Sequence, residues 1–145
     1  MSEDGALPRE DEQPIAMVSE VSASGYRGEL RLGHHHLVVD EGPEVGGNDE
    51  GPNPYQLLLA ALAHCTTATL RMYADRKGWD LGEIRVRARL LRTGDGATKV
   101  ERIERTIRIR HDLSEEQRHR LAEIADRTPV TRTLLSSVAI DTTLE

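Results

Sequence analysis

The chain of 145 residues contains a single cysteine, Cys65. One thiol excludes an intramolecular disulfide and the common zinc frameworks, which need several cysteines. Aromatic residues are scarce as well, at 3% of the chain, and phenylalanine is absent. A core must therefore be built from aliphatic side chains, and a dimer that buries further aliphatic surface would help to stabilise it.

An excess of basic charge and long apolar runs are also missing. The formal net charge is -6, which argues against a nucleic-acid or anionic-membrane partner. No apolar run reaches membrane-spanning length, and the N-terminus lacks the basic-then-apolar order of a signal peptide. The sequence therefore predicts a soluble, cytoplasmic protein with no nucleic-acid and no membrane partner.

Arginines nevertheless gather in two segments of the second half of the chain. They are Arg85, Arg87, Arg89, Arg92, Arg102, Arg105, Arg108 and Arg110. Steps of mostly two or three residues are typical of one solvated face of paired strands. An RNA-binding surface is the less favoured alternative.

Length and composition predict one domain over residues 14–145. Residues 1–13 are acidic, rich in turn-forming residues and without periodicity, which predicts a disordered tail. Three short segments before the Gly- and Pro-rich stretch at 41–53 predict an antiparallel meander. These segments are 15–23, 26–32 and 35–40.

A long helix is predicted to follow this stretch. Asn53 is a favoured N-cap, Pro54 suits the first helical position, and a largely apolar run then continues to Gly78, which is suited to end the helix. The run is apolar over much of its circumference, so this helix should be the central one.

The remaining elements are indicated by alternation and by helix caps. Apolar residues alternate with arginine in two segments that a turn at 94–96 divides, and SEEQ from Ser114 is a capping box. The predicted elements are strands 83–92 and 99–110, a helix from Ser114 to about Asp126, a helix from Thr128-Pro129 through Leu134, and a last strand 137–143. The order predicts an α+β domain with antiparallel sheet packed on helices.

Cys65 lies near the middle of the long helix, where the helix dipole does not help to form a thiolate. A small buried hydrophobic side chain is the common role for such a cysteine. His34 and His36 would share one face of a strand but have no identifiable third ligand, so a metal site is not favoured. His64 is adjacent to Cys65, yet neighbours on a helix do not face each other. No cofactor and no metal are expected.

The motif GGNDEGPNPYQLLLAALAHCTTATLRMYADRKGWDL, with LAEIADRTPVTRTL later in the chain, resembles the signature of OsmC/Ohr proteins, in particular a subgroup of redox proteins. The resemblance runs from about residue 26 to the C-terminus and includes the segment LGHHHLVVDE. It implies an intertwined homodimer, in which antiparallel sheet wraps around long central helices and two active sites lie at the subunit interface.

The resemblance also implies a reaction. A peroxidatic cysteine in the central helix attacks the O–O bond of an organic hydroperoxide, and a second cysteine at the start of a later helix resolves the sulfenic acid as a disulfide. Cys65 matches the first cysteine, whereas Thr128 stands at the position of the second. A single thiol permits sulfenic acid formation but not internal resolution. Thr128 is still suited to cap its helix, whose N-terminus would then favour a thiolate beside it.

Active members also carry a glutamate in the turn before the helix, paired with an arginine from the early strands. Here Tyr55 and Gln56 occupy the places where that glutamate is found. Arg27 is the best match for the thiolate-activating arginine, and Arg31 is the second.

Two functions follow as predictions, and a sulfur-carrier or thiol-transfer role is a third alternative that differs from the first only in the electrophile. The first is a thiol-dependent peroxidase that reduces organic hydroperoxides, or hydrogen peroxide, in oxidative-stress defence, with Cys65 as nucleophile and an external thiol or dithiol as reductant. The second is a noncatalytic protein that binds a small apolar ligand, with Cys65 as a packed structural thiol. Both are expected to be homodimers.

Overall fold

The computed structural model describes residues 18–21 and 23–145, and it divides the chain into two compact units, up to Leu58 and from Leu59 onward. The predicted tail at 1–13 lies outside the described residues, and the prediction of one domain over 14–145 stays a prediction. Among the described residues, no helix is long and apolar enough to cross a membrane.

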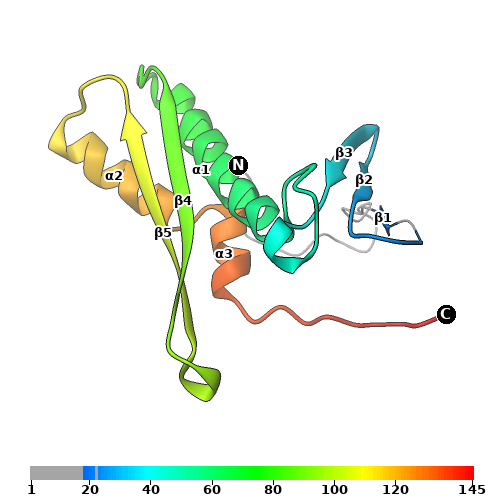
Figure 1. The fold of residues 1–145 in the computed structure, drawn as a ribbon. Coiled ribbons are helices and arrows are strands. Elements are labelled where there is room, and N and C mark those ends of the chain that lie inside the picture. The colour runs from blue at the N-terminus through cyan, green and yellow to red at the C-terminus, as the bar shows by residue number, and fades with distance from the viewer. Residues whose placement is uncertain (1–17, 22) are drawn as a thin grey trace. The chain divides into compact units, whose positions relative to one another are not determined.

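The first unit contains the predicted meander, which is confirmed over the described residues, while 15–17 and 22 of its predicted first strand lie outside them. Its strands are β1 (Val18–Val21), β2 (Gly28–Leu32) and β3 (His35–Val39), joined in that order into an antiparallel sheet (Figure 1). Gly33 closes the turn between β2 and β3 with a positive φ of 63°, a conformation that glycine adopts without strain. The 3₁₀ helix η1 (Pro43–Val45) follows in the loop.

The long helix α1 (Pro54–Lys77) has the predicted bounds. Asn53 and Gln56 cap its start reciprocally: the Gln56 N–H donates to Asn53 Oδ1 at 2.8 Å, and the Asn53 N–H donates to Gln56 Oε1 at 2.9 Å. Two otherwise unsatisfied donors are thereby paired. Beyond the helix, Gly78 takes a φ of 70°, as a glycine C-cap does.

The second unit contains a long antiparallel hairpin of β4 (Ile84–Thr93) and β5 (Val100–Ile109), with the 3₁₀ helix η2 (Gly96–Thr98) in its connection. Half-buried and exposed residues alternate along both strands, as predicted. Figure 1 shows that the hairpin runs alongside α2 and extends well past its end.

Helices α2 (Glu115–Ala125) and α3 (Pro129–Leu135) complete this unit. Ser114 and Gln117 form the predicted capping box, and Thr128 caps α3 through its side chain. The core of the unit is a cluster of buried residues from α1, α2 and the segment before β4. They are Leu70, Tyr73, Ala74, Leu81, Leu121 and Ala125.

The predicted strand at 137–143 is wrong. These residues form neither strand nor helix, and the chain runs on from α3 to the C-terminus as an extended segment (Figure 1). Val138 is 58% exposed and Ile140 is 85% exposed. The apolar sequence is suited to a strand, but no described strand pairs with it, and a strand needs such pairing to form. The predicted α+β class is confirmed, with three α-helices and two antiparallel sheets in the described part of the chain.

Candidate functional site

Cys65 lies near the middle of α1 and is half-buried. Its Sγ is 3.9 Å from the hydroxyl of Thr69, one turn further along the helix, and either atom can donate. Thr69 itself is buried, at 5% exposure. The hydroxyl of Thr69 is therefore positioned to donate a hydrogen bond to a thiolate at Cys65.

The face of α1 that carries Cys65 is largely uncovered in a single chain. Leu58 and Met72 are exposed at 37% and 55%, Ala61 is also exposed, and Ala68 is half-buried. With Cys65 in the middle, these five residues follow one another at steps of three and four, the spacing of a helix face that packs on another helix. We call them the Cys65 stripe.

A neighbouring face of α1, which carries Thr66, is closed by a largely buried arginine, Arg105 of β5, whose side chain is 13% exposed. Its Nη1 donates to Thr66 Oγ1 at 3.1 Å and to Thr131 Oγ1 at 2.9 Å. Its Nη2 donates to the backbone oxygen of Ala125 at 2.8 Å. One guanidinium therefore joins α1, the end of α2 and the first turn of α3.

Thr128, at the position where the resemblance implies a second cysteine, is fully buried. Its hydroxyl lies 2.6 Å from the hydroxyl of Thr131 and accepts a hydrogen bond from the Thr131 N–H. Contacts thus run from Thr128 through Thr131 and Arg105 to Thr66, the residue that follows Cys65 in α1. The predicted cap is confirmed, and its hydroxyl takes part in a buried polar network.

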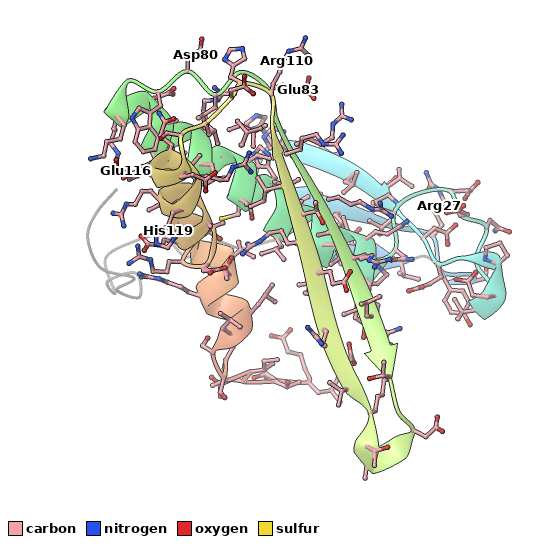
Figure 2. All side chains as sticks on the ribbon, turned by 90° about the vertical axis from the view of Figure 1, so that its left-hand side faces the viewer. Arg27, Asp80, Glu83, Arg110, Glu116 and His119 are labelled. Atoms are coloured by element: carbon pink, nitrogen blue, oxygen red, sulfur yellow. The ribbon has the colours of Figure 1, made fainter. Side chains whose placement is uncertain are left out.

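The expectation that the arginines of the hairpin all lie on a solvated face is wrong for Arg105. In β5 the half-buried residues alternate as Ile103, Arg105, Ile107 and Ile109, so Arg105 occupies an apolar register position. Its cross-strand partner is Ala88, a small residue that leaves room for a long side chain. The other arginines of the hairpin are exposed, among them Arg110 beside Glu83 at the end of the hairpin (Figure 2).

Arg27, the predicted thiolate activator, directly precedes β2 in the first unit (Figure 2). Its side chain is 48% exposed, with Nε 3.4 Å from Glu50 and Nη1 4.0 Å from Glu29. Arg31 is paired with Glu20 at 2.6 Å. Arg27 is thus paired with a carboxylate of the loop before α1, that of Glu50.

A buried carboxylate that sequence reasoning missed organises that loop. Asp40 is 2% exposed and accepts hydrogen bonds from the backbone N–H groups of Glu41, Asn48 and Glu50, at 2.8, 3.2 and 3.2 Å. Burial acts to raise the pKa of Asp40, but these hydrogen bonds and the Arg27 charge hold that pKa below its ordinary value of 3.8. The segment between β3 and α1 is therefore an ordered loop.

The histidines that the sequence singles out lie in or near β3 and on α1. His34 lies in the turn before β3, and its ring is 4.1 Å from that of His35. His64 is exposed on α1. In the described part of the chain, no three histidine, cysteine or acidic residues are grouped so that they could hold a metal ion.

A pocket of about 470 Å³ opens in the second unit, next to the Arg105 network. Leu62, Ile103, Leu134 and Leu135 supply apolar walls, and Arg105 supplies a charged one. This volume lies within the range of small-molecule sites.

The family model described as OsmC-like protein matches residues 46–143. An uncharacterized protein of Haloferax volcanii is 28% identical over 109 residues, which cover 74% of this chain and 77% of that protein. The OsmC-like protein of Mycoplasma pneumoniae has a similar solved structure, with a TM-score of 0.71 at 17% identity over 86% of this chain and 89% of that one. An organic hydroperoxide resistance protein of Elizabethkingia anophelis, with thiocyanate bound, has a TM-score of 0.66 at 20% identity over 86% and 90%.

Proposed function

From the premise that this chain belongs to the OsmC-like protein family, we propose that it is a thiol-dependent peroxidase that reduces organic hydroperoxides and hydrogen peroxide in oxidative-stress defence. The observation that carries the proposal is the placement of Cys65. It lies half-buried on an uncovered face of α1, beside a hydroxyl donor and inside the segment that matches the family. The names of similar structures, which include organic hydroperoxide resistance proteins, support the substrate class.

The proposed first step is attack of the Cys65 thiolate on the distal oxygen of the hydroperoxide. An S–O bond forms, the O–O bond breaks, and the alkoxide leaves as the alcohol after it takes up a proton. Sulfur loses two electrons to the peroxide and becomes a sulfenic acid. Thr69 Oγ1, at 3.9 Å from Sγ, would stabilise the thiolate before attack.

The proposed return to the thiol uses an external reductant, because the chain has no other cysteine. A thiol condenses with the sulfenic acid, releases water and leaves a mixed disulfide on Cys65. A second thiol then displaces Cys65 and carries the disulfide away. Such a cycle needs a compartment that keeps thiols reduced, which is why we propose the cytoplasm.

Arg27 is proposed as an activator of the thiolate. It is paired with Glu50 and Glu29, which would orient its guanidinium. Thr128 is proposed to occupy the place of a resolving cysteine.

We propose that the working unit is a homodimer. The Cys65 stripe presents apolar side chains at the spacing of a helix–helix contact, and the C-terminal segment leaves Val138, Ile140 and Leu144 at 58, 85 and 98% exposure. Apolar surface of this kind is buried at subunit interfaces. A second chain would also supply the pairing that residues 137–143 lack.

Turnover of hydroperoxide tests the proposed function. Reduced protein is mixed with cumene hydroperoxide and an excess of dithiol, and loss of peroxide is followed for the wild type and for Cys65→Ser. We expect turnover that Cys65→Ser abolishes. Equal peroxide loss in the two proteins would refute the assignment of Cys65.

The Thr128→Cys variant tests the equivalence of position 128. If this residue stands where a resolving cysteine would, hydroperoxide should produce an intramolecular disulfide with Cys65, seen as a mass loss of about two hydrogens. A variant that folds but forms only the sulfenic acid would show that the position is not equivalent.

The second candidate function is binding of a small apolar ligand in the pocket beside Arg105. The apolar walls of this pocket favour it, and so does the lack of any cation contacting Sγ among the described residues. If this is the function, Cys65→Ser should bind a panel of apolar carboxylates as tightly as the wild type in calorimetry, and the wild type should not turn over peroxide.

A further inference from the structure

We propose that Arg105 is a positioning residue for Cys65: its largely buried guanidinium holds the first turn of α3 against the turn of α1 that carries the thiol, and it places a positive charge there. The inference rests on the proposed function, because it explains how a mid-helix cysteine with no cation in contact can react. Arg105 belongs to β5 and is not one of the early-strand arginines to which the resemblance gives the activating role.

The hydrogen bonds of Arg105 define the position. Thr66, which accepts from Nη1 at 3.1 Å, directly follows Cys65 in α1 and is fully buried. Its own hydroxyl donates to the backbone oxygen of Leu62 at 2.7 Å, so the guanidinium is tied to the helical turn that contains Cys65. The contact with Thr131 ties the same group to the network of Thr128.

The charge of Arg105 is only weakly compensated. Its nearest acidic group among the described residues is Asp126, at 3.6 Å, with a side chain that is 83% exposed. The other three partners are two hydroxyls and a backbone oxygen, which carry no net charge. An arginine stays protonated at all working pH values, and a positive charge in a poorly solvated place favours a nearby thiolate over the thiol.

The helix dipoles of α1 and α3 add little positive potential at Cys65. Cys65 lies in the middle of a helix of 24 residues, outside the reach of the dipole at its ends. Helix α3 has only seven residues, so its own dipole is small. Arg105, by contrast, is a cation of the second unit whose hydrogen bonds reach the residue next to Cys65.

Alkylation of Cys65 measures this effect without any peroxide. The rate of reaction of the reduced protein with iodoacetamide is followed by intact mass between pH 5 and pH 10, for the wild type, Arg105→Met, Arg105→Lys and Thr131→Val. Arg108→Gln is the matched control, because Arg108 lies three residues further along β5 and is exposed. Circular dichroism confirms that each protein is folded.

At pH 7 we expect Arg105→Met to react about tenfold more slowly than the wild type, with the midpoint of its pH–rate profile moved up by about one pH unit. Arg105→Lys keeps the positive charge but loses the hydrogen bonds that the planar guanidinium makes to several partners. Its rate and midpoint should lie between those of the wild type and of Arg105→Met. Arg108→Gln should overlay the wild type.

A folded Arg105→Met whose pH profile overlays that of the wild type would overturn the inference, because a purely structural arginine would change stability alone. If Arg105→Met does not fold, the pH–rate profiles of Arg105→Lys and Thr131→Val are compared with that of the wild type instead, and profiles that overlay it would overturn the inference. Failure of the wild type to react with hydroperoxide would instead refute the proposed function. The alkylation profiles would still test the effect of Arg105 on Cys65, because they need no peroxide.

Discussion

Asp40 and Arg105 are two buried or largely buried charges that organise their surroundings in opposite ways. Asp40 is an anion held by three backbone N–H groups, whose residues lie 1, 8 and 10 positions along the chain. Arg105 is a cation held by oxygens, whose residues lie 20, 26 and 39 positions away. The first shapes one loop of its own unit, and the second joins three helices of the other.

Under the proposal for Arg105, the difference separates a residue that acts on the reactive thiol from a residue that orders a loop. Two of the donors to Asp40 belong to the loop that contains Glu50, the partner of Arg27, and the Arg27 charge also helps to lower the pKa of Asp40. Arg105 touches the residue next to Cys65 directly. Long-range contacts also make the loss of Arg105 costly for the whole unit.

The largest effect on stability is expected for Arg105→Met. The substitution removes three hydrogen bonds from a charged donor and leaves the Ala125 carbonyl with one partner fewer. We expect the free energy of unfolding to fall by about 3 kcal/mol, measured by urea denaturation at pH 7. Arg108→Gln should change it by less than about 0.5 kcal/mol. A loss as small in Arg105→Met as in this control would show that the three helices do not depend on the guanidinium.

A smaller and pH-dependent effect is expected for Asp40→Asn. Because the pKa of Asp40 is lowered in the folded protein from 3.8, its contribution to stability is present above that value and is lost as the pH falls through the folded pKa. The wild type should therefore be more stable than Asp40→Asn at pH 7, and the difference should shrink below about pH 4. Urea denaturation at pH 7, 5, 4 and 3 gives the comparison. A difference that stays constant down to pH 3 would contradict the role of the carboxylate.

The smallest effect is expected for Arg27→Gln. Both of its ion pairs are exposed, and exposed pairs contribute little, so the free energy of unfolding should change by less than about 0.5 kcal/mol. If Arg27 activates the thiol, the variant should nevertheless lose peroxide turnover. Stability and turnover measured on the same preparation separate the two roles, and an unchanged turnover would remove Arg27 from the site.

Local signals in the sequence predicted most of the fold. Caps at Asn53, Ser114 and Thr128 and the alternation in the hairpin depend on neighbours along the chain, and all of them are found. The prediction of a strand at 137–143 is wrong because a strand needs a second strand to pair with, and the local sequence pattern does not show whether one is present.

The candidate site was predicted less completely, for a related reason. Cys65 and Thr128 came from the resemblance, but Arg105 was counted with the solvated arginines, although its place between Ile103 and Ile107 is an apolar register position. Checking each arginine against the strand period would have singled it out. The role of Asp40 had no such signal, since its donors are backbone groups of a loop.

The most direct test of the central claim is intact-mass spectrometry of the reduced protein after brief exposure to stoichiometric cumene hydroperoxide with a sulfenic-acid trap. The account predicts rapid addition of one trap molecule to the wild type, none to Cys65→Ser, and recovery of the original mass with added dithiol when the trap is omitted. A wild-type protein whose Cys65 stays unmodified while the protein is folded and reduced would contradict the peroxidase assignment and favour the ligand-binding function.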